Sequence, residues 1–359
     1  VGTTFSSRGQ DLRLQAHHVT VGPWRGVVGV QAERLRFSAL GDEAFVPGTL
    51  TRSQALFVLE EAEFGAWRLQ AGARSERVQV ASDGDPDADA VRFGPAVGRR
   101  FSPTSASIGL TWRSGDGWAL GVNLGHTERA PAYYELYANG VHVATAAVER
   151  GDATLGVERS RNLGATLEWR QGAQGLKASV YDTRFARFIS LAATGRDVDS
   201  GGVSMPEYRF EPVRARFRGF ELEGRRRLVE RPWALDLTAV IDTVRAHDLD
   251  RGTPLPRLAP LRVQLGLDMT SGAWAMGLSA RHSARQDRVA DGDRPTPAFT
   301  LWSAWLSWRL PTQGAETTVF ARLDNLTNQL AYNATAVPTI RDLAPQGGRA
   351  LTMGLRVQL

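Results

Sequence analysis

Apolar and polar residues alternate along segments of about ten residues, and short turns and long loops join these segments in turn. The clearest pair of segments carries apolar residues at Ala106, Ile108, Leu110, Trp112, Trp118, Leu120, Val122 and Leu124. A period of two puts these residues on one face of a strand and the polar ones on the other. The pattern predicts a transmembrane antiparallel β-barrel, with lipid outside and a wet lumen inside.

The same pattern predicts fifteen strands along the chain. Their spans are 3–20, 26–39, 50–62, 66–80, 99–114, 117–129, 155–170, 175–190, 207–228, 232–246, 259–271, 273–285, 298–310, 315–329 and 348–359. Single-chain bacterial barrels have even strand numbers, and an open strand edge is not viable in lipid. We therefore expect either that at least one strand is missing from this wall or that the true strand count differs from fifteen by one.

Connections of two lengths alternate, as in outer-membrane barrels with short periplasmic turns and longer extracellular loops. The long ones are predicted near 40–49, 81–98, 130–154, 191–206, 247–258, 286–297 and 330–347. Eight of the ten tryptophans lie near short turns: Trp24, Trp67, Trp112, Trp118, Trp169, Trp233, Trp274 and Trp308. Interfacial girdles hold such side chains at headgroup level, so we expect a membrane girdle there.

The composition and the motifs of the chain argue against several classes of function. The chain has 359 residues, no cysteine and a net charge of +5, with Lys177 as its only lysine. Arginine alternates with apolar residues over 213–218, which suits the lining of a barrel lumen better than a nucleic-acid surface. No apolar run is long enough for a transmembrane helix. No hydrolase, metalloprotease or phosphate-loop motif is present, so we expect no enzyme.

A family resemblance begins at Glu128-Arg129-Ala130-Pro131, which continues through Glu135-Leu136-Tyr137 to Gly140. This stretch resembles the "R-x-P-x-x-x-E-L-Y-A-x-G" motif of TonB-dependent outer-membrane receptors. The segments 141–145, 158–164, 323–328 and 347–355 resemble further motifs of that family in family order, and 37–47 resembles a loop of its zinc-uptake branch.

The resemblance implies a 22-strand barrel with an N-terminal plug, of which residues 1–359 would be strands eight to twenty-two. It implies a monomer in the bacterial outer membrane with its C-terminus in the periplasm. Its partners would be outer-membrane lipid, an extracellular nutrient and, through the plug, the TonB-ExbB-ExbD complex. No resident cofactor is expected. The nutrient would be a metal ion, a metal chelate such as a siderophore, haem or a vitamin, and the zinc-type loop favours a metal ion.

Two loop clusters are candidate metal ligands, because His and carboxylate side chains bind Zn²⁺. The first is His142 with Glu149 and Asp152, and the second is His247 with Asp248. Loop hydrogen bonding is the alternative for both. A passive porin or structural barrel is the alternative function, and an omptin-like barrel enzyme using His247 or Asp248 is a third.

Overall fold

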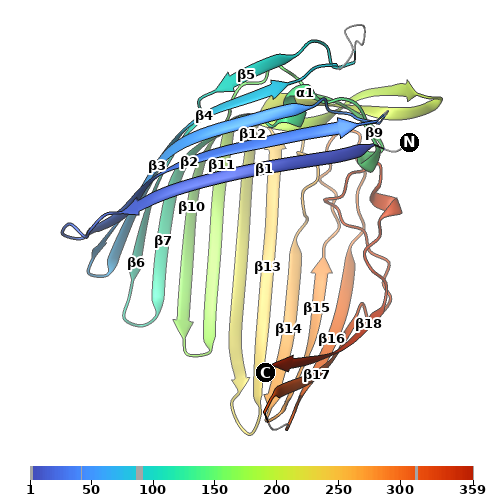
Figure 1. Ribbon diagram of the computed structural model, residues 1–359. Coiled ribbons are helices and arrows are strands. Elements are labelled where there is room, and N and C mark those ends of the chain that lie inside the picture. Colours follow the sequence, from blue (N-terminus) through green and yellow to red (C-terminus); the bar gives the residue numbers. More distant parts are fainter. Residues whose placement is uncertain (1–2, 42, 86–91, 312–313, 359) are drawn as a thin grey trace.

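Fifteen long strands form one curved antiparallel wall in a computed structural model that describes residues 3–41, 43–85, 92–311 and 314–358 (Figure 1). They are β1 (Thr4–His17), β2 (Trp24–Leu40), β3 (Thr49–Phe64), β4 (Trp67–Ser82), β6 (Thr104–Arg113), β7 (Trp118–Arg129), β10 (Glu158–Gln171), β11 (Gln174–Ser200), β12 (Val203–Val229), β13 (Ala234–Asp248), β14 (Arg262–Ser271), β15 (Trp274–Ser283), β16 (Phe299–Leu310), β17 (Glu316–Asp324) and β18 (Ala350–Gln358). The fifteen predicted strands are thus confirmed. No pairing of β1 with β18 joins the described residues.

Short elements lie in the long connections. They are the strands β5 (Val97–Phe101), β8 (Asn139–His142) and β9 (Ala147–Arg150), the helix α1 (Tyr133–Tyr137) and the 3₁₀ turns η1 (Val143–Thr145) and η2 (Arg341–Leu343). None of the helices in the described part of the chain is long and apolar enough to span a bilayer.

Cross-strand register gives the wall an apolar face and a polar face. One row of directly opposed residues reads Leu120, Leu167, Ala178, Leu222 and Ile241. The neighbouring row, on the other face, reads Gly121, Thr166, Ser179, Glu221 and Asp242. Many large apolar side chains of the first face are exposed, including Leu120 at 46% and Leu265 at 47%. Exposed apolar side chains in continuous rows suit a wall whose solvent on that side is lipid.

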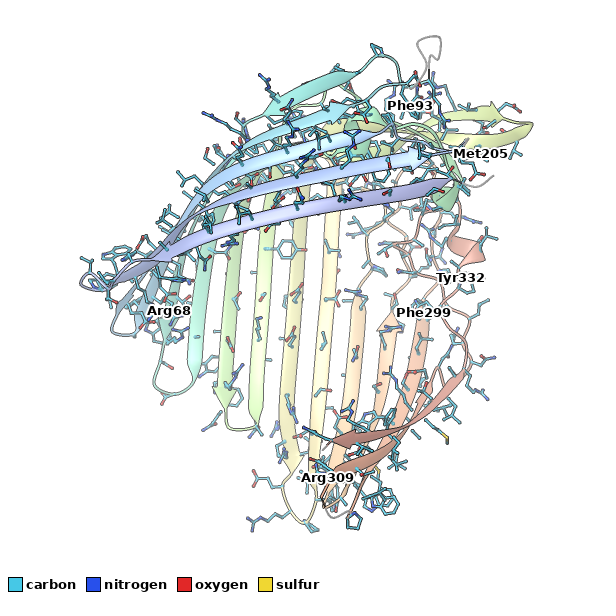
Figure 2. The ribbon with its side chains drawn as sticks, in the orientation of Figure 1. Arg68, Phe93, Met205, Phe299, Arg309 and Tyr332 are labelled. Carbon is cyan, nitrogen blue, oxygen red and sulfur yellow. The ribbon has the colours of Figure 1, made fainter. Side chains whose placement is uncertain are left out.

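The two ends of the wall differ. Figure 2 places Arg68 and Arg309 at the end with short connections, and Phe93 and Met205 at the opposite end, where the long connections gather. The eight girdle tryptophans lie at the short-connection end. Trp67 is opposite Trp112, Trp118 is opposite Trp169, and Trp274 stacks on Trp308 with ring centroids 5.1 Å apart. Their position at a lipid headgroup layer stays a prediction.

The prediction of a long connection at 191–206 was wrong. The strands β11 and β12 each run for 27 residues and meet in the two-residue turn Gly201-Gly202, where both glycines have positive φ. Glycine pairs favour such hairpin turns because they adopt these backbone angles without steric cost. The glycines and Pro206 that suggested a loop are accommodated in an extended hairpin, with a register shift between Ala193 and Asp197.

Two other predicted strands have different limits. The strand expected at 99–114 is interrupted at Ser102-Pro103, which separates β5 from β6, since proline has no amide to donate to a ladder. The strand expected at 315–329 ends at Asp324. Asn325 adopts a left-handed φ of 48° there, and its side-chain oxygen accepts a hydrogen bond from the Gln329 amide at 2.8 Å.

We expect an added charge to destabilise the apolar face much more than the polar face. Replacing Leu265 by Arg on the apolar face should cost about 2–4 kcal/mol of folding free energy, because it places a guanidinium in hydrocarbon. Gln264→Arg, one residue away on the polar face, should cost less than about 1 kcal/mol. Urea titration of the complete receptor folded into phospholipid vesicles measures both. Equal losses for the two variants would contradict the assignment of faces.

Candidate functional site

The long connection between β7 and β10 folds back over the mouth of the wall. Helix α1 contributes Leu136 and Tyr137 to a buried cluster with Val78 and Val80, which lie on the polar-face side of β4. The Tyr137 hydroxyl donates to the Val80 carbonyl at 3.1 Å. Strand β9 pairs in parallel with β12 through residues 148–150 and 207–209. The loop is therefore fixed from both sides.

An arginine between two glutamates anchors this loop. Arg129 donates to the Glu135 carboxylate at 2.8 and 2.9 Å and to the Glu158 carboxylate at 2.8 and 3.0 Å. Glu135 also accepts from the Ala132 amide at 2.7 Å, and Glu158 from the Ile189 amide at 2.9 Å. Both carboxylates are buried. The motif residues Arg129 and Glu135 thus join the last residue of β7 to α1, β10 and β11.

A cavity of about 450 Å³ lies beside this anchor, at the long-connection end. Its lining comes from segments far apart in the sequence, including Phe45, Tyr134, His142, Glu149, Tyr208, Phe210, Asp248, Arg251 and Val337. The lining combines aromatic rings, carboxylates and cationic groups. Burial raises the pKa of Tyr134, so its phenol stays neutral and able to donate at neutral pH. Cavities of this size with a few convergent polar groups suit small-molecule ligands.

His142 is held in a defined orientation in this cavity. Its ring stacks on Phe45 with centroids 4.0 Å apart, and its Nδ1 lies 2.9 Å from the Glu149 carboxylate. Thr145 donates to the same Glu149 oxygen at 2.9 Å. Within the described part of the chain, His142 Nε2 has no hydrogen-bond partner. A carboxylate that orients one ring nitrogen and leaves the other available is the arrangement found behind metal-ligating histidines.

The other predicted metal ligands are dispersed. Asp152 accepts from the amide and hydroxyl of Thr154 and does not line the cavity. Asp248 lines it, and its carboxylate accepts from the amides of Asp250 and Arg251. His247 is adjacent to Asp248 in β13 and therefore points to the opposite face, opposite Arg216. Among the described residues, no group of three or more His, Cys, Asp or Glu side chains could hold a metal ion.

The sequence patterns did not identify most of the cavity lining. Tyr208, Phe210 and Arg251 carry no local motif, and they meet Phe45 only because the loops converge. Tyr134 and Glu135 lie inside the motif that begins at Glu128, Phe45 lies in 37–47 and His142 in 141–145, so the family motifs were the available signal.

The family model for the TonB dependent receptor-like β-barrel matches residues 2–326. The chain belongs to this family. Receptor barrels of this family are outer-membrane proteins, and its members are transporters and receptors rather than enzymes.

Solved structures share the fold of this receptor barrel. The copper transporter OprC is 20% identical, with a TM-score of 0.80, over 98% of this chain and 56% of that chain. The hemophore receptor HasR of Serratia marcescens, solved with its hemophore HasA and heme, is 18% identical with a TM-score of 0.69, over 98% of this chain and 59% of its own. The ferric citrate transporter FecA is 16% identical with a TM-score of 0.71, over 99% and 55%. The chain thus spans little more than half the length of these proteins.

Arg129 should be a structural requirement of the cavity. Arg129→Met leaves two buried carboxylates without their cation, and we expect a loss of roughly 3 kcal/mol in the stability of the loop over 130–157. Limited proteolysis of the complete receptor should then cleave this loop faster. The double variant Arg129→Met with Glu135→Gln should recover part of the protection, because one unpaired charge is removed. Unchanged cleavage in Arg129→Met would disprove this role.

Proposed function

We propose that this barrel is the wall of an outer-membrane transporter that imports a scarce nutrient, either a metal ion or a metal chelate such as a siderophore. The long connections face the outside, the C-terminus lies in the periplasm, and the TonB-ExbB-ExbD complex supplies the energy to a monomer. The main support is the cavity at the long-connection end, which contains an oriented histidine. The related folds of a copper transporter and a ferric citrate transporter support the substrate class.

The cavity serves to capture the nutrient in this proposal. His142 binds the metal through Nε2, while Glu149 and Phe45 hold the ring. Asp248 contributes a further carboxylate from β13. The volume of about 450 Å³ exceeds the needs of a bare ion and favours a chelate, whose organic part contacts Tyr134, Tyr208 and Phe210. Asp152 has a structural role in this proposal, because its carboxylate accepts the Thr154 amide in the loop turn.

Metal binding by the complete receptor should depend on His142. Isothermal titration with zinc should show at least about tenfold weaker binding for His142→Ala, since a ligand is removed, and a smaller loss for Glu149→Gln, which only orients it. The matched control is His17→Ala, an exposed histidine at the short-connection end. Unchanged zinc affinity in His142→Ala would remove His142 from the proposed site.

Uptake measurements separate the transporter from a passive porin or structural barrel. Cells that express the complete receptor should accumulate radiolabelled zinc or a ferric chelate at low external concentration only when TonB is present. A porin would conduct equally in a strain without TonB. Equal accumulation with and without TonB would therefore overturn the energised mechanism and favour the passive alternative.

A further inference from the structure

Five basic side chains stand directly opposite one another across five adjacent strands. They are His126 in β7, Arg161 in β10, Arg184 in β11, Arg216 in β12 and His247 in β13, and we call them the basic row. Neighbouring strands are about 4.8 Å apart, so the row extends over roughly 20 Å. Arg161, Arg184 and Arg216 carry like charges directly opposite one another, which destabilises a sheet, so the row needs an anionic partner.

The basic row belongs to the apolar face of the wall, so Arg216 and Arg218 do not line the lumen as the sequence pattern predicted. Two residues further from the long connections, the next row on this face reads Leu124, Leu163, Asp182, Arg218 and Arg245. Leu124 and Leu163 are 53% and 50% exposed. The rows beyond are apolar, with Leu120, Leu167 and Leu222 among them. The charges therefore lie where the apolar band ends, which is the height of lipid headgroups in a membrane wall.

The carboxylates nearby do not neutralise these charges. Asp182 is the one carboxylate in the two rows, which contain five arginines, and it forms ion pairs with three of them, Arg184, Arg216 and Arg218. Its oxygens lie 3.0 Å from Arg216 Nε and 3.1 Å from Arg218 Nε. His126 also lies 3.4 Å from Glu128, one row further out.

Three arginines at or beside these rows keep free guanidinium groups. Within the described residues, Arg161, Arg245 and Arg288 form no ion pair. Arg245 and Arg288 line a depression of about 540 Å³ together with Arg216, Arg218 and His247.

We propose that the basic row, with Arg218, Arg245 and Arg288, binds the phosphate groups of a phosphorylated lipid in the outer leaflet. Guanidinium groups match phosphate oxygens with paired hydrogen bonds and stay charged at every relevant pH. The exposed leucines in the next row away from the long connections provide a contact surface for acyl chains. A free phosphate would make no use of this apolar surface. The inference relies on the proposed orientation, in which the long connections face the outside.

Lipid retention tests the proposal on the complete receptor. The triple variant Arg161→Gln, Arg245→Gln and Arg288→Gln removes three guanidinium groups that hold no ion pair in the described structure. The matched control is Arg113→Gln, Arg226→Gln and Arg231→Gln, three exposed arginines at the short-connection end. After purification in detergent, mass spectrometry should find about tenfold less phosphorylated glycolipid with the first triple variant and no change with the control. Equal retention in all three proteins would overturn the proposal.

A second measurement uses the unmodified receptor and tests whether the phosphate is the group that is recognised. Native mass spectrometry of the unmodified receptor should show binding of lipid A, and about tenfold weaker binding of its dephosphorylated form. Inorganic phosphate at the same concentration should not displace lipid A. Equal binding of the two lipids, or displacement by inorganic phosphate, would overturn the assignment to a lipid phosphate.

Orientation is checked separately, so that failure of the lipid site and failure of the proposed function can be told apart. Residues 1–359 contain no cysteine, so a single cysteine introduced there is the one thiol of this part of the receptor. In intact cells, a membrane-impermeant maleimide should label Ala144→Cys in η1 and spare Ala173→Cys in a short turn. The opposite labelling would reject the orientation and with it both proposals. Correct labelling with unchanged lipid retention would reject the lipid site alone.

Discussion

Backbone hydrogen bonding in hydrocarbon is the constraint on which this structure depends. An amide or carbonyl without a partner costs several kcal/mol in lipid, so each membrane-spanning segment must be fully paired with its neighbours. The ladders between β6, β7, β10, β11, β12 and β13 meet this requirement along the wall. Irregular backbone is then confined to the two ends, and the longer connections can carry binding residues without disturbing the wall.

Alternation within strands explains why the wall could be predicted from the sequence. Each strand repeats the same two-residue period, so local patterns sufficed to locate all fifteen strands. The error at 191–206 arose because glycine and proline indicate turns in general. Only the tertiary structure decides between a loop and an extended hairpin. In the chain, Gly201 and Gly202 form a two-residue turn, and β11 and β12 continue beyond the wall as a pair.

The candidate site was less predictable, because its residues have no shared local pattern. Phe45, His142, Asp248 and Val337 come from four different connections or strand ends, and their convergence depends on loop packing. His142 and Glu149 were predicted together and are together, because β8 and β9 pair and bring them within hydrogen-bond distance. His247 and Asp248 were predicted together and point apart, because adjacent strand residues face opposite sides. Positions on the two strands of one hairpin thus predict which side chains lie together, whereas adjacency within a strand does not.

The parallel pairing of β9 with β12 has an energetic consequence for recognition. A loop that must become ordered around its ligand spends binding free energy on lost backbone and side-chain freedom. Here the ladder at 148–150, the Arg129 ion pairs and the buried side chains of α1 have already restricted that freedom before any ligand arrives. A nutrient present at very low concentration would meet a preorganised surface, and a larger part of its contact energy would appear as affinity.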